Sequence, residues 1–169
     1  MPDYYSASIH IGGHLNAAAR TALAEAIEAD EATQDYGGRT LTIEMALGAI
    51  DEAVDNGTSL DLYDDRTPGG EFHEIEATCA AFALPFLRQT EAKYGEDAEC
   101  LYFDGAEEHA TVTSQDGEGV ATAREIRAAM ATGTMDALLA MLDLTSAAIP
   151  PLTFAPGAAE AAPTAKRPD

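Results

Sequence analysis

Apolar and polar residues alternate along several short stretches of the chain, which is the period of a strand with one buried face. In the first stretch, residues 5–11, apolar side chains occupy every odd position, and Gly12 and Gly13 end the pattern. A glycine-containing loop at residues 115–119 indicates a hairpin that turns toward Val120. These patterns predict strands over residues 5–11, 59–64, 86–90, 98–103 and 109–113.

Elsewhere, apolar residues recur every three or four positions, which is the period of an amphipathic helix. Asn16 and Thr42 are residue types that cap helix N-termini, and Asn56-Gly57 is a typical C-terminal signal. Pro85 limits the third helix, because the residue before a proline avoids the helical region. These patterns predict helices over residues 16–31, 42–56, 71–83, 123–131 and 135–147.

The order of these elements is β-α-α-β-α-β-β-β-α-α, which is not a regular alternation of strands and helices. It predicts an α+β fold, a single domain with a mostly antiparallel sheet and helices packed on one face. We assign residues 1–149 to this acidic domain and residues 150–169 to a tail rich in proline and alanine. We expect the tail to be attached through Leu152 and Phe154 and to be disordered beyond them.

Composition adds a strong charge to this picture. The chain has 169 residues, 46% of them apolar, and a formal net charge of -21. Residues 21–119 hold 24 carboxylates against four cationic side chains, a net charge of -20 over 99 residues. Such a chain disfavours nucleic acid as a direct partner and favours a basic protein surface. No apolar run approaches the ~20 residues of a membrane helix, no signal peptide is evident, and we expect a cytoplasmic protein without a membrane partner.

A few residues could carry chemistry. Asp61, Asp64 and Asp65, followed by Glu71, suggest a carboxylate cluster around a strand end, where a metal-dependent hydrolase could bind Mg²⁺. Nucleases also need basic residues to hold phosphates, and Arg66 alone is nearby. The same acids equally suit a solvated loop and the N-terminus of the third helix.

Other arrangements are weaker. His10 and His14 have the spacing of a helical metal pair, but the glycines between them argue against a helix. Cys79 and Cys100 are expected to be buried free thiols. We therefore predict no catalytic residue, no metal site and no cofactor.

The function we expect is that of a non-catalytic acidic module that binds another protein. In its extreme form it is a nucleic-acid mimic that inhibits a DNA- or RNA-binding protein. The charge level is similar to that of small DNA-mimic inhibitors directed against restriction or CRISPR nucleases, a similarity of composition that transfers no functional residue. The partner-binding candidates are Glu25, Glu28, Glu44, Asp51, Glu52, Asp55, Asp61, Asp64 and Asp65.

In an alternative explanation, the negative charge has no role in the protein's function. The chain has two lysines, Lys93 and Lys166, and an acid-rich, lysine-poor composition is typical of proteins from salt-rich cells. Carboxylates then keep the surface hydrated. The sequence supports the binding module and the salt adaptation equally, and both ahead of the hydrolase. It does not predict the oligomeric state.

Overall fold

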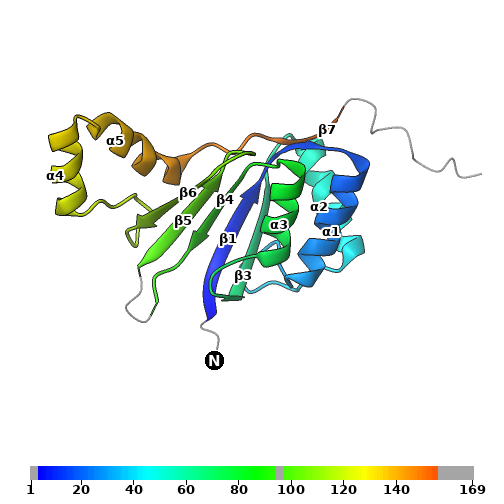
Figure 1. The fold of residues 1–169 in the computed structure, drawn as a ribbon. Coiled ribbons are helices and arrows are strands. Elements are labelled where there is room, and N and C mark those ends of the chain that lie inside the picture. Colours follow the sequence, from blue (N-terminus) through cyan, green and yellow to red (C-terminus); the bar gives the residue numbers. More distant parts are fainter. Residues whose placement is uncertain (1–3, 94–96, 156–169) are drawn as a thin grey trace, which may run out of the picture.

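The computed structural model describes residues 4–93 and 97–155 of the chain. Within these residues a five-stranded antiparallel sheet has the spatial order β3-β1-β4-β5-β6 (Figure 1). The fold is α+β, as the order of elements predicted. The strands of the sheet are β1 (Tyr4–Ile11), β3 (Leu60–Pro68), β4 (Phe86–Thr90), β5 (Ala98–Phe103) and β6 (Glu108–Thr113).

Three helices pack on one face of this sheet in the described part of the chain, and the hydrophobic core lies between them and the strands (Figure 1). Ile9 and Ile11 of β1 point into this layer, and so do their cross-strand neighbours Leu62, Leu60 and Phe86. The odd positions of β1 are therefore the buried ones, as the alternation predicted. The helices of this layer are α1 (Ala17–Ala29), α2 (Ile43–Asn56) and α3 (His73–Phe82).

Local caps define where α1 and α2 begin and end. The Asn16 side chain accepts a hydrogen bond from Ala19 N at 2.8 Å, and Thr42 Oγ1 accepts one from Met45 N at 3.4 Å. Gly57 ends α2 in the left-handed conformation, with φ of 64°. Each cap satisfies backbone groups that a helix end leaves unpaired. The caps thereby fix which residues of each helix face outward.

The start of α3 is capped by another helix. Asp30, which follows α1, accepts hydrogen bonds from Glu74 N at 3.0 Å and from Ile75 N at 2.9 Å. Burial raises the pKa of Asp30 above its ordinary value, and the two backbone hydrogen bonds oppose that rise. Asp30 thus joins the end of α1 to the start of α3.

A buried arginine ties α3 to the sheet. Arg88 of β4 is 3% exposed, and its guanidinium donates to Gly70 O at 2.6 Å and to Glu99 Oε1 at 2.9 Å. Its Nε lies 3.0 Å from Glu76 Oε1 of α3, an ion-pair contact without hydrogen-bond alignment. Burial raises the pKa of Glu76, and the charge of Arg88 opposes that rise.

On the second face of the sheet, the end of α5 (Met135–Asp143) and the 3₁₀ turn after it contact the strands, and α4 (Ala123–Thr132) packs on α5. Thr111 Oγ1 donates to Met141 O at 3.5 Å, and Gln89 Nε2 donates to Thr145 O in the 3₁₀ turn that follows α5, at 3.3 Å. We call α4 and α5 the arm, because they stand away from the sheet (Figure 1). No helix in the described part of the chain is both long and apolar enough to span a membrane.

The glycines after β1 allow two segments that are distant in the sequence to pack closely. Strand β2 (Gly13–Leu15) pairs in parallel with β7 (Leu152–Phe154). A Cβ atom on Gly12 would lie 1.9 Å from Pro150 O, so a side chain there would displace the C-terminal segment. Leu152 is fully buried and Phe154 packs against the core, so the expected attachment is confirmed. The rest of the expected disordered tail, residues 156–169, lies outside the described residues.

Two predicted boundaries were wrong. Strand β3 continues to Pro68 rather than ending at Asp64, because a register shift opposite Tyr5 and Ala7 lets it stay paired with β1. The residues predicted as a polar loop after Asp64 are therefore largely strand. The last α-helix ends at Asp143 rather than Ala147, because a 3₁₀ turn follows it.

Candidate functional site

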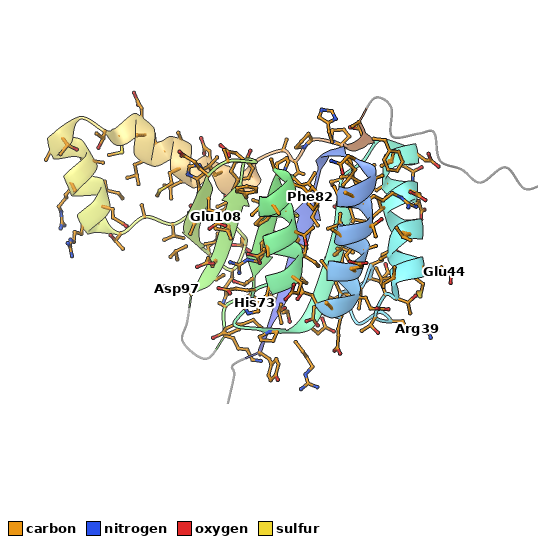
Figure 2. All side chains as sticks on the ribbon, turned by 45° about the vertical axis from the view of Figure 1, so that its right-hand side comes forward. Arg39, Glu44, His73, Phe82, Asp97 and Glu108 are labelled. Atoms are coloured by element: carbon orange, nitrogen blue, oxygen red, sulfur yellow. The ribbon has the colours of Figure 1, made fainter. Side chains whose placement is uncertain are left out.

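The outer surfaces of α1 and α2 carry carboxylates that the sequence analysis proposed for partner binding. Because α1 buries Leu23 and Ile27, and α2 buries Ile50, the polar positions of both helices turn outward. Figure 2 shows the side chains of this layer, with Glu44 at one end of α2. We call the exposed carboxylates of the two helices the acidic helix surface: Glu25, Glu28, Glu44, Glu52 and Asp55.

The sixth predicted helix carboxylate, Asp51, has a structural contact. It accepts hydrogen bonds from Arg20 Nε at 2.8 Å and from Arg20 Nη2 at 2.6 Å. This hydrogen bonding raises the pKa of Arg20 further above its ordinary value. Such a two-point pair between a planar guanidinium and a carboxylate is geometrically specific. Asp51 therefore joins α2 to α1, and its charge is balanced locally.

Two carboxylates of the acidic helix surface lie where the helix dipole disfavours a negative charge, whereas Glu44 lies in the favourable first turn of α2. Glu28 and Asp55 lie in the last turns of α1 and α2, where no basic residue balances them. A charge of the unfavourable sign at a helix end costs about 0.3–1 kcal/mol. Glu28 Oε1 accepts a hydrogen bond from Ile43 N at 3.1 Å, whereas the other four carboxylates make no hydrogen bond or ion pair with a described residue. Local contacts with described residues therefore do not hold Glu25, Glu44, Glu52 and Asp55.

The carboxylates predicted on β3 are in different surroundings from one another. Asp61 lies opposite His10 on β1, with 2.7 Å between Asp61 Oδ1 and His10 Nδ1, and the same oxygen accepts from Ser59 Oγ at 2.8 Å. Asp64 Oδ1 accepts from the backbone N–H of Arg66 at 2.9 Å. Burial raises the pKa of Asp64, with the neighbouring Asp65 adding to the rise.

The proposed cluster from Asp61 to Glu71 is not gathered at one point. Because β3 runs to Pro68, these two residues lie near opposite ends of a nine-residue strand that spans about 26 Å at about 3.3 Å per residue. Across residues 4–93 and 97–155, no group of three or more His, Cys, Asp or Glu could hold a metal ion. His10 and His14 also contact different residues: His10 contacts Asp61, whereas His14 Nδ1 lies 2.6 Å from Thr153 Oγ1.

The cysteines are buried and carry no disulfide. Cys79 lies in α3 and Cys100 in β5. Burial raises the pKa of Cys100 to about 11, and it raises the pKa of Cys79 as well. Since the thiolate is the nucleophilic form, neither side chain is activated for covalent catalysis near neutral pH.

A hollow of about 550 Å³ opens on the second face of the sheet. Its lining includes Ser6 and Ser8 of β1 and the tyrosines Tyr36 and Tyr63, and 3.2 Å separate Ser6 Oγ from Tyr36 OH. The volume is in the range of small-ligand pockets, which is about 300–1,000 Å³. The described lining contains no lysine or arginine. This hollow was not predicted from the sequence. The polar residues at the even positions of β1 did indicate that one face of the sheet is not covered by apolar packing.

No family model, curated protein or solved structure matches this chain. Once the carboxylates in local contacts are set aside, the acidic helix surface and the polar hollow are two features of the described surface that could bind a partner. The acidic helix surface has the stronger chemical signature, because its charge is of one sign and is not balanced by its described neighbours.

Proposed function

We propose that the protein is a non-catalytic binding module whose acidic helix surface docks on a basic face of another protein. The observation that supports this is the gathering of exposed carboxylates on one helical layer, where the nearest helical cation, Arg20, is already paired with Asp51. A surface with charge of one sign attracts an oppositely charged surface and accelerates their encounter.

A nucleic-acid-binding protein is the narrower form of this proposal, and the charge spacing limits how it works. At about 1.5 Å per residue, Glu44, Glu52 and Asp55 are spread over about 16 Å of the α2 axis. Duplex DNA carries one charge per about 1.7 Å of its axis. Even with the two carboxylates of α1, the surface therefore has about half the charge density of a duplex. It would compete for a basic groove by general charge attraction rather than by reproducing the spacing of phosphates.

Affinity capture from a host lysate tests the proposal. The surface variant is the triple substitution Glu25→Gln, Glu52→Gln and Asp55→Asn, which changes side chains without hydrogen bonds to described residues. We expect the native protein to capture basic proteins at low salt and the surface variant to lose them. Because neutralising Asp55 also relieves an unfavourable charge at the end of α2, the variant should remain folded.

A matched control removes the same number of charges elsewhere: Glu107→Gln, Glu108→Gln and Glu118→Gln, all at exposed positions. Figure 2 shows Glu108 on β6, across the molecule from Glu44. We expect this control to capture the same basic proteins as the native chain. Equal capture by all three proteins would contradict the role of the acidic helix surface.

Salt separates this proposal from adaptation to a salt-rich cell. Binding through charge weakens with salt, because the screening length falls from about 10 Å at 0.1 M to about 3 Å at 1 M. A protein adapted to high salt instead unfolds when salt is removed. We expect the chain to stay folded at low salt, where capture is strongest. Unfolding at low salt, measured by circular dichroism, would favour the adaptation.

A further inference from the structure

The arm exposes apolar side chains that the rest of the described chain does not cover. Ala129 is the only buried residue of α4, and α5 has none, in a stretch where every residue is described. The exposed fractions are 69% for Met130, 50% for Leu139 and 40% for Ile126. Ile126 and Met130 are four residues apart and so share one face of α4, and clustered exposed apolar side chains are typical of interaction surfaces.

The arm helices are too short to be stable without packing. They have ten and nine residues, whereas isolated helices shorter than about 12–15 residues are marginal in water. The capping box formed by Thr122 and Glu125, and the left-handed Gly133 at the end of α4, hold the ends of that helix in place. The arm is therefore a well-formed pair of helices whose apolar side chains have no cover in the described structure.

Charge distinguishes what kind of partner fits the arm. Residues 120–149 have a net charge of -1, against -20 for residues 21–119. Within the arm, α4 has Arg124, Glu125 and Arg127, a net charge of +1, and α5 has Asp136 and Asp143, a net charge of -2. A basic partner suited to the acidic helix surface would meet two arginines here. A second arm offers both apolar side chains and the opposite charge for each helix.

We propose that two copies of this chain associate through their arms in a two-fold arrangement, with α4 of one copy packed against α5 of the other. Because the arm stands away from the sheet and the helical layer (Figure 1), this arrangement keeps the two acidic bodies apart. It also brings Arg124 and Arg127 near the carboxylates of the facing α5. Closed two-fold dimers are the commonest form of self-association, and they use the same surface on both copies.

The oligomeric state of the full chain tests this proposal. Sedimentation should show a dimer at both about 0.1 M and about 1 M salt, because the apolar contacts of the arm are not screened by salt. Binding of a basic partner is lost as salt rises, so the two proposals can fail separately. A native chain that sediments as a monomer at both salt concentrations would overturn the dimer.

Single substitutions locate the interface. Met130→Glu and Leu139→Glu should each weaken the dimer at least about tenfold, because each charge enters the interface twice. Met45→Glu is the matched control, since Met45 is 41% exposed on α2, outside the arm, and should leave the dimer unchanged. Circular dichroism checks that each variant is folded. Equal weakening by the control and the arm variants would place the interface elsewhere.

A charge exchange tests the pairing of α4 with α5 of the second copy. Reversing the arginines, with Arg124→Glu and Arg127→Glu, should weaken the dimer. Adding Asp136→Lys and Asp143→Lys to the same chain should restore it, because every facing pair is again of opposite sign. Failure of the second pair of substitutions to restore the dimer would contradict this arrangement of the helices.

Discussion

Arg88 is the side chain whose removal should harm the fold most clearly. The substitution Arg88→Met keeps an apolar side chain of similar length but leaves the Glu76 carboxylate, 16% exposed, without its counter-charge. Breaking a buried ion pair by removing one partner costs about 3–5 kcal/mol. Loss of the hydrogen bond to Gly70 O is part of that cost, whereas Glu99, with 47% of its side chain exposed, adds little. We expect Arg88→Met to lower the free energy of unfolding by about 3–5 kcal/mol.

Urea unfolding followed by circular dichroism measures this change, and two further variants identify its cause. Glu99→Gln should cost at most about 1 kcal/mol, because its half of the network is solvated. The double variant Arg88→Met and Glu76→Met should recover part of the lost stability, since an apolar replacement of a buried pair is often neutral. Recovery is partial because Phe72 N, which donates to Glu76 Oε1 at 2.9 Å, and Gly70 O each lose a hydrogen bond. A loss below about 1 kcal/mol for Arg88→Met, or a double variant no more stable than the single one, would refute this reasoning.

Three other predictions concern the core, the ionisable groups and the thiols. Leu152→Ala should cost about 2–5 kcal/mol in urea unfolding, because Leu152 is fully buried; a negligible loss would mean that β7 is not part of the core. Burial raises the pKa of Glu76 and Asp30 above their ordinary values of 4.5 and 3.8, so the folded chain binds these protons more tightly than the unfolded chain. Their contribution is complete below those ordinary values and is lost as pH rises through the folded pKa, so the melting temperature should rise as the pH is lowered from neutral toward those ordinary values, and a fall would contradict this. Cys79 and Cys100 should react with a thiol reagent only after unfolding, and rapid labelling of the folded protein would show that they are accessible.

Local patterns predicted the five strands of the antiparallel sheet, the helices and most of their ends, but not the short strands β2 and β7. Asn16 and Thr42 cap the helices that they were expected to cap, and the odd positions of β1 face the core. These features depend on residues within one or two turns of one another. The exposure of the acidic helix surface was predictable for the same reason, since the helical period turns those positions away from the sheet.

Contacts between distant segments were not predictable. Arg20 and Asp51 are 31 residues apart, and His10 and Asp61 are 51 apart, so no local pattern showed which carboxylates have partners. The pairing of β2 with β7 joins segments about 139 residues apart in the sequence, and each strand is too short to give a periodic signal. The hollow is assembled from all five strands of the sheet, the loop that holds Tyr36 and the loop after β6, and only the folded sheet brings them together.

Carboxylate footprinting of the chain with a captured basic protein tests the central claim most directly. A water-soluble carbodiimide with an amine label modifies exposed carboxylates, and mass spectrometry reports the extent at each one. The account predicts that the partner protects Glu25, Glu52 and Asp55 at low salt, that the protection is lost at high salt, and that Glu107 is labelled equally throughout. Unchanged labelling of Glu25, Glu52 and Asp55 in the complex would contradict it.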